Sequence, residues 1–141
     1  MELTEPTFSR PAQSASGAGL NGVLIGVVDD DASILRALQR LLGAAGFAVQ
    51  TFRSGEELLA SQQLDRIQCL VLDVHLTGLS GFDVQERLAE DHRAIPIVFI
   101  TAHDDASTRE RAGRTRASQY LRKPFDEHSL IAAIQTAVRS A

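Results

Sequence analysis

The run Cys69-Leu-Val-Leu-Asp73 is apolar, has no polar alternation and ends on a carboxylate. Such a run predicts a strand that is buried on both faces. Gly78 and Gly81 follow it, so we expect the chain to turn just beyond the carboxylate. In an open parallel sheet, ligands bind at the edge formed by the carboxyl ends of the strands. Asp73 is therefore the first candidate for a functional residue.

Strand-like and helix-like segments alternate along the rest of the chain. Strands are predicted over residues 23–28, 47–52, 69–73, 97–101 and 117–122, with a helix after each. Parallel pairing follows because each right-handed crossover needs a covering helix. We therefore expect an α/β fold: a flavodoxin-like, doubly wound, five-stranded parallel sheet with strand order 2-1-3-4-5 and five helices.

Several residues predict where helices begin and end. Gly46 is placed to end the first helix in a left-handed conformation. Ser54 and Glu57 have the spacing of a capping box, and Ser80 and Asp83 can cap the third helix. The fourth helix is predicted over 106–116, but its apolar face is poor.

Composition limits the class of protein. The chain has 141 residues, 44% of them hydrophobic, a net charge of −4 and one cysteine. We expect a flexible tail over 1–22 and one domain over 23–141, because only the tail is rich in Pro, Gly and Ser without an apolar period. The charge disfavours direct nucleic-acid binding by this domain, and no membrane span or signal peptide is recognisable. A single cysteine suits the cytoplasm.

Three carboxylates are predicted to share one crevice. The switch point of this fold lies between strands one and three, which brings Asp29 and Asp30 beside Asp73. At about 5 Å and an effective dielectric of 20, each pair repels by roughly 3 kcal/mol. Such a cluster persists only if a cation offsets the repulsion or some of the groups are protonated, and oxygen ligands at an open site suit Mg²⁺. The alternative is that these acids cap the first helix, which is the only role we expect for Asp31.

Two further polar residues are predicted at strand ends on the same edge of the sheet. Thr101 ends strand four and can present its hydroxyl there. Lys123 ends strand five and is the only lysine in the chain. A compact ammonium suits a narrow pocket that holds a carboxylate and a phosphoryl oxygen better than the planar fork of arginine does.

Together these segments resemble the receiver domain of two-component response regulators. The matching segments are Val27-Val-Asp-Asp-Asp31, Leu70-Val-Leu-Asp73, Phe99-Ile-Thr-Ala102 and Arg122-Lys-Pro-Phe125. No single segment is specific to this family. Four segments that occur in the same order, each at the end of a predicted strand, are together strong evidence for the resemblance. The resemblance covers about residues 24–138, and its spacing is similar to that of regulators with helix-turn-helix output domains.

The resemblance implies a phosphorylation switch that catalyses only its own phosphorylation and dephosphorylation. Asp73 would accept a phosphoryl group from a histidine kinase or a phosphotransfer protein. Asp29, Asp30, Asp73 and the backbone carbonyl of His75 would hold Mg²⁺. The metal and Lys123 would offset charge on the phosphoryl oxygens during transfer.

The resemblance also implies how the signal is passed on. Thr101 would hydrogen-bond the attached phosphoryl group, and Tyr120 would turn inward as Thr101 moves. The surface of the fourth helix, fifth strand and fifth helix would then bind an output protein; a second copy of the chain is another candidate partner. The alternative for Tyr120 is an ordinary half-buried strand aromatic. The Lys123–Pro124 bond resembles the cis peptide of the family, which would aim the lysine inward, whereas a trans bond is the general expectation for a peptide bond before proline.

Some positions depart from the family or remain open. Thr77 stands where receivers often have proline, and Arg116 lies in a turn that favours small residues. An arginine-rich segment near the fourth helix is either a solvated face or a docking surface for an acidic partner; its members are Arg109, Arg111, Arg114 and Arg116. His75 and His103, each two residues after a site residue, are modulators of phosphoryl lifetime or exposed loop residues.

Two other functions share some of these features with the receiver. A phosphatase of the haloacid-dehalogenase type would need a second aspartate where this chain has His75. A receiver-like interaction module that acts without phosphorylation would usually lack one of the acids, the threonine or the lysine. Within the favoured class, a stand-alone regulator and the receiver of a longer transcription factor both remain open.

Overall fold

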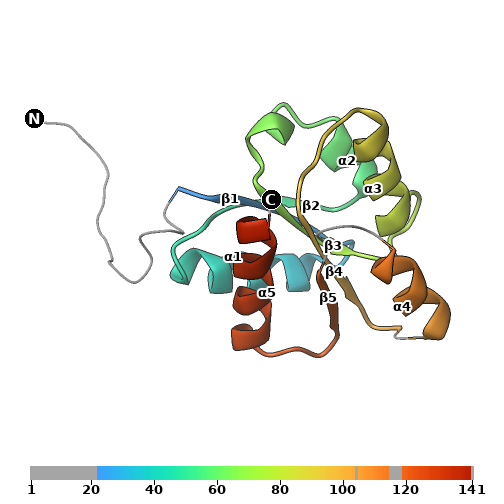
Figure 1. Ribbon diagram of the computed structural model, residues 1–141. Helices are drawn as coiled ribbons and strands as arrows, with labels where there is room; N and C mark the ends of the chain where they lie inside the picture. Colours follow the sequence, from blue (N-terminus) through green and yellow to red (C-terminus); the bar gives the residue numbers. More distant parts are fainter. Residues whose placement is uncertain (1–21, 104, 115–118, 141) are drawn as a thin grey trace, which may run out of the picture.

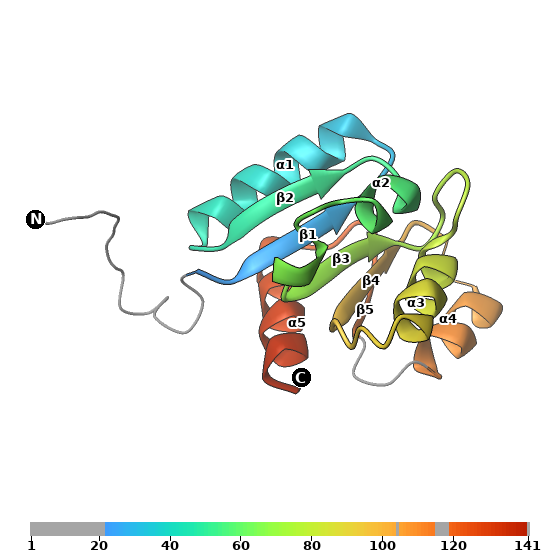
Figure 2. The ribbon, with the colours of Figure 1, turned by 90° about the horizontal axis from the view of Figure 1, so that it is seen from above.

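The computed structural model describes residues 22–103, 105–114 and 119–140. Its five strands are β1 (Leu24–Val28), β2 (Ala48–Phe52), β3 (Cys69–Asp73), β4 (Ile97–Thr101) and β5 (Gln119–Arg122). All neighbours pair in parallel, in the order β2-β1-β3-β4-β5 (Figure 2). This is the predicted sheet. The tail, apart from Gly22, and the turn at Arg116 lie outside the described residues.

Helices cover both faces of the sheet (Figure 1). They are α1 (Ala32–Ala44), α2 (Gly55–Leu59), α3 (Gly81–Glu90), α4 (Ala106–Gly113) and α5 (Glu127–Ser140), with a short 3-10 turn, η2 (Leu64–Arg66). The helices α1 and α5 pack on one face, and α2, α3 and α4 pack on the other. The doubly wound architecture is therefore confirmed. Among the described residues, no helix has the length and apolar character needed to cross a membrane.

Burial along each strand explains its sequence pattern. Every residue of β3 and β4 is buried, because both strands lie inside the sheet with helices on either side. The edge strand β2 instead alternates exposed and partly buried residues and ends on the buried Phe52. Cys69 lies within the core, where burial raises the pKa of its thiol to about 12. It is a packing residue rather than a reactive one, because a protonated thiol is a poor nucleophile.

The helix ends follow the predicted capping with one correction. Gly46 has φ of 101°, the left-handed conformation expected after α1. Ser80 and Asp83 form a reciprocal capping box at α3. At α2 the Ser54 hydroxyl accepts from the Glu57 N–H, but the Glu57 carboxylate accepts from the N–H of Arg53. The predicted capping box is thus only half formed, because the side chain of Glu57 reaches one residue further back.

Strand register brings the site residues to one edge of the sheet. Val28 of β1 pairs with Leu72 of β3, so the next residues, Asp29 and Asp73, are neighbours at the carboxyl edge. Gly81 begins α3 directly against this edge. A Cβ atom added there would lie 2.5 Å from the carbonyl oxygen of Asp73.

We predict that Gly81→Ala lowers the free energy of unfolding by about 1–3 kcal/mol, because a methyl group would force the backbone of β3 and α3 apart. Gly43→Ala is the matched control. Gly43 lies within α1 and a Cβ there would have no atom within 4 Å, so this change should stabilise the chain by about 0.5–1 kcal/mol. Urea denaturation measures both. Equal effects of the two substitutions would contradict the close packing at Asp73.

Candidate functional site

Three carboxylates meet at the carboxyl edge of the sheet. Asp29 and Asp30 follow β1, and Asp73 is the last residue of β3. One carboxylate oxygen from each lies within 4.8 Å of the others. Asp29 and Asp73 are 1% and 6% exposed, whereas Asp30 is exposed to solvent. The structure thus brings together the acids that the strand order predicted.

Lys123 reaches into this cluster from the end of β5. Its Nζ lies 3.0 Å from Oδ2 of Asp29 and 3.4 Å from Oδ2 of Asp73. The N–H of Lys123 donates to the carbonyl oxygen of Thr101 at 2.7 Å, which ties the end of β5 to the end of β4. The Lys123–Pro124 peptide bond is cis, as the resemblance implied.

Burial and charge act in opposite directions on the two central groups. Burial raises the pKa of Asp73 above its ordinary value, although the N–H of His75 and the charge of Lys123 favour the carboxylate. Burial would lower the pKa of Lys123, but its hydrogen bond to Asp29 and the charge of Asp73 outweigh burial, so the pKa lies above its usual value. Lys123 is therefore a fixed positive charge beside the candidate nucleophile.

The donor set fits a hard divalent cation. Three carboxylates and one ammonium carry a formal charge of −2 together, which one divalent ion balances. Carboxylate oxygens at an edge open to solvent suit Mg²⁺, which keeps several of its waters. Oδ1 of Asp73 accepts from the N–H of His75 at 3.0 Å, so the start of the following loop also orients this carboxylate. The role of the His75 carbonyl as a ligand stays a prediction.

Asp31 lies next to these acids in the sequence but has a different structural role. Its Oδ1 accepts from the N–H groups of Ser33 and Ile34 at the start of α1. Asp29 in turn accepts from the N–H of Asp31 at 2.9 Å. Asp31 is the N-cap of α1, as predicted, and helps to hold the loop that presents Asp29.

Thr101 is fully buried, and its hydroxyl bonds to its own loop. Oγ1 accepts from the N–H of His103 at 3.0 Å and donates to the carbonyl oxygen of His103 at 3.3 Å. His75 and His103 also meet each other, since their ring centroids are 5.0 Å apart in an edge-to-face arrangement. The predicted modulators therefore form a pair that joins the loop after β3 to the loop after β4.

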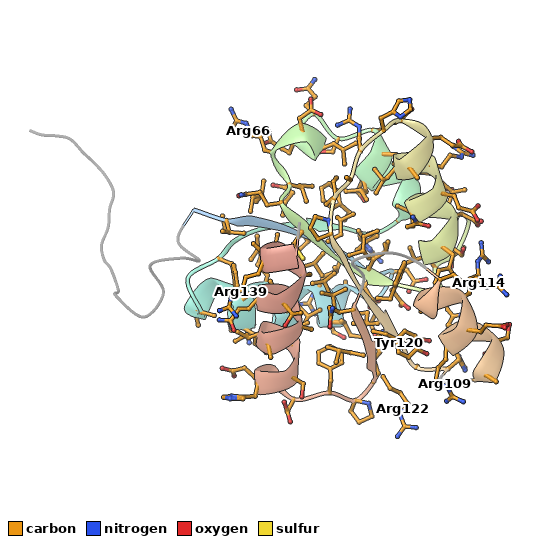
Figure 3. All side chains as sticks on the ribbon, in the orientation of Figure 1. Arg66, Arg109, Arg114, Tyr120, Arg122 and Arg139 are labelled. Carbon is orange, nitrogen blue, oxygen red and sulfur yellow. The ribbon has the colours of Figure 1, made fainter. Side chains whose placement is uncertain are left out.

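Tyr120 is half-buried in β5, opposite Phe99 of β4. It packs against the core cluster on the face that α3 and α4 cover, and Figure 3 labels it beside β5. This environment agrees with a half-buried strand aromatic and leaves the switch role as a prediction.

The arginines near α4 have different surroundings. In Figure 3, Arg109 and Arg114 are labelled on α4 and Arg122 at the end of β5. Arg114, the residue just after α4, pairs with Glu110 of that helix at 3.5 Å. Arg111 pairs with Glu86 at 3.1 Å and lies 4.7 Å from the ring centre of Phe82. Arg111 thus connects α4 to α3, so the segment is not a uniformly solvated face. Arg116 lies outside the described residues.

Two contacts to Asp30 were not predicted from the sequence. Both the N–H and the hydroxyl of Thr77 donate to its carboxylate. Nη2 of Arg53 lies 3.5 Å from its backbone carbonyl oxygen. Only the departure of Thr77 from the proline common in receivers marked this position, and nothing in the sequence pointed to Arg53.

Comparisons with known proteins agree with this geometry. The family profile described as response regulator receiver domain matches residues 25–135. Nodulation protein W of Bradyrhizobium diazoefficiens is 43% identical over 114 residues, 81% of this chain and 50% of that protein. Response regulator protein TmoT of Ectopseudomonas mendocina is 39% identical over 118 residues, 84% of this chain and 54% of that protein.

A solved structure is similar as well. The response regulator receiver protein from Burkholderia phymatum is 43% identical and has a TM-score of 0.70, over 83% of this chain and 95% of that chain. The chain spans about half the length of the two curated relatives. The family profile covers nearly all of the folded part, and the sheet has the expected order. The chain belongs to the response regulator receiver domain family.

Proposed function

We propose that this chain is a phosphorylation-dependent signalling switch. Asp73 accepts a phosphoryl group, with Mg²⁺, from a histidine kinase or a phosphotransfer protein in the cytoplasm. The observation that carries the proposal is the convergence of Asp29, Asp30 and Asp73 within 4.8 Å, with the ammonium of Lys123 at 3.0 and 3.4 Å from two of them.

The transfer step uses these groups in distinct roles. A carboxylate oxygen of Asp73 forms a bond to phosphorus while the bond from phosphorus to the donor imidazole nitrogen breaks, and the imidazole keeps the electron pair. Lys123 stabilises negative charge on the phosphoryl oxygens. Asp29, Asp30 and Asp73 would hold the divalent cation, which supplies further charge neutralisation when bound. The chain thus acts on its own carboxylate rather than on a separate substrate.

The readout begins at Thr101. Its hydroxyl bonds only to the backbone of His103 among the described residues, so a rotation toward the phosphoryl group would release that loop. Tyr120 follows Thr101 inward, and the surface of α4, β5 and α5 changes for an output protein. The difference in free energy comes from new hydrogen bonds to the phosphoryl oxygens, which only the phosphorylated state can make.

Incubation with acetyl phosphate and Mg²⁺ should add the mass of one phosphoryl group to Asp73, in an acid-stable and base-labile form. Asp73→Asn should abolish the addition, because the amide cannot act as the nucleophile. Asp31→Asn is the matched control and should be phosphorylated normally, because asparagine is also a good N-cap. Intact-protein and peptide mass spectrometry measure the outcome. A phosphoryl group that persists in Asp73→Asn would contradict the assignment.

Lys123→Met should lower the free energy of unfolding by about 3 kcal/mol in EDTA, because it leaves two buried carboxylates without their partner. Mg²⁺ should restore part of this loss. Phosphorylation should slow by about 100-fold or more, since one charge that stabilises the transition state is missing.

Two further variants control the lysine experiment. Lys123→Arg keeps the charge but not the shape, so we expect it to phosphorylate slowly as well. Arg36→Met removes an exposed cation of α1 and should change the unfolding free energy by less than about 0.5 kcal/mol. Urea denaturation and the acetyl phosphate assay measure these effects. Normal phosphorylation of Lys123→Met would rule out the role of the ammonium.

His75→Ala and His103→Ala should each shorten the phosphoryl lifetime several-fold. The two rings contact each other, and the backbone N–H groups of His75 and His103 bond to Asp73 and Thr101. Removing either ring should give the attacking water a wider path to the phosphoryl group. His128→Ala is the control, because His128 is exposed on α5. The decay of phosphorylated protein after removal of the donor gives the lifetime. If both variants have the phosphoryl lifetime of the wild type, His75 and His103 do not control that lifetime.

A further inference from the structure

Thr77 makes an unusual contact with the candidate metal site. It lies in the loop between β3 and α3, four residues after Asp73. Its N–H donates to Oδ2 of Asp30 at 3.3 Å, and its hydroxyl donates to the same oxygen at 3.2 Å. Asp30 is 47 residues earlier in the chain, at the end of β1. One residue of the β3–α3 loop therefore holds the exposed acid of the cluster with two hydrogen bonds.

Asp30 needs such support more than its neighbours do. Asp29 and Asp73 are buried, so packing limits their side chains, whereas Asp30 is exposed. An exposed aspartate exchanges rotamers freely unless a partner fixes it. Within the described part of the chain, Thr77 provides the only hydrogen bonds to this carboxylate.

The contact leaves room for a cation. A carboxylate has about four lone-pair sites on its two oxygens. Both donors of Thr77 go to Oδ2, and Oδ1 accepts no hydrogen bond from the described residues. Thr77 therefore orients Asp30 without using up its capacity to bind a metal.

The loop that carries Thr77 is itself anchored. Just beyond it, the N–H of Leu79 donates to Oε2 of Glu56 in α2 at 3.4 Å. The capping box of Ser80 and Asp83 then fixes the start of α3. On the other side, the N–H of His75 bonds to Asp73. Contacts on both sides thus make Thr77 part of a preorganised frame.

We infer that Thr77 is a positioning residue that fixes Asp30 for Mg²⁺ binding. The inference rests on the proposed function, because it needs the divalent cation. Hydrogen-bond partners of metal ligands typically contribute about 10- to 100-fold in metal affinity. Thr77 supplies one donor that every residue except proline has and a second that only a short hydroxyl side chain provides. The hydroxyl is therefore the part that distinguishes this chain.

Isothermal titration of the unphosphorylated chain with Mg²⁺ alone tests the inference. Thr77→Val keeps the N–H and the shape but removes the hydroxyl, and should weaken Mg²⁺ binding by about tenfold. Thr77→Ser keeps both donors and should bind within about twofold of the wild type. Because Thr77 is exposed, all three proteins should unfold at the same temperature in EDTA, which excludes a merely structural effect.

An affinity of Thr77→Val for Mg²⁺ equal to or tighter than that of the wild type would overturn the positioning role. Asp30→Asn separates this failure from a failure of the proposed function. If Asp30→Asn loses Mg²⁺ binding and Thr77→Val does not, the result supports the metal site and contradicts only the positioning role of Thr77. If the wild type binds no Mg²⁺, or if Asp30→Asn binds it normally, the result contradicts the proposed metal site and therefore also the inference about Thr77.

Discussion

Repulsion among three carboxylates is the constraint on which the rest of this structure depends. At 4.8 Å and an effective dielectric of 20, each pair repels by about 3 kcal/mol, less where the exposed Asp30 is screened by solvent. The ammonium of Lys123 offsets part of this because it contacts both buried acids. The remaining negative charge favours a bound divalent cation, which would also offset the charge that a phosphoryl group adds.

The sheet keeps these charges together by burying apolar residues on both faces. The strands that lead to the acids, β1 and β3, lie side by side in the interior of the sheet, and β3 is buried throughout. Helices pack on both faces. Moving either strand end away would disturb the close packing of apolar side chains on both faces of the sheet.

The sequence predicted the parts of this arrangement that depend on the backbone. The bounds of β3 and β4 agree with the prediction, because each is a continuous apolar run that ends on a polar residue. The strand order then placed Asp29, Asp30, Asp73 and Lys123 at one edge. The contacts between loops were not predicted, because hydrophobic periodicity sets which face a residue occupies and does not set a loop rotamer.

Thr77 and Glu57 illustrate that limit. The bonds from Thr77 to Asp30 join segments 47 residues apart, so they depend on tertiary structure rather than on local propensity. Glu57 has capping-box spacing, yet its carboxylate bonds to Arg53 rather than to Ser54. In both cases a polar side chain had more than one partner within reach, and the folded geometry selected one of them.

The distribution of apolar contacts also bears on where a conformational change costs least. Only Thr108 and Ala112 of α4 are buried, whereas α1 buries three leucines and α3 buries Phe82, Val84 and Leu88. The contact of Arg111 with Glu86 and Phe82 is partly exposed, so it contributes little to holding α4 in place. Helices with few buried apolar groups are the first to move, because little hydrophobic free energy is lost. The surface proposed to change on phosphorylation therefore includes α4, which buries fewer apolar side chains than α1 or α3, and it also includes β5, the strand that directly precedes Lys123.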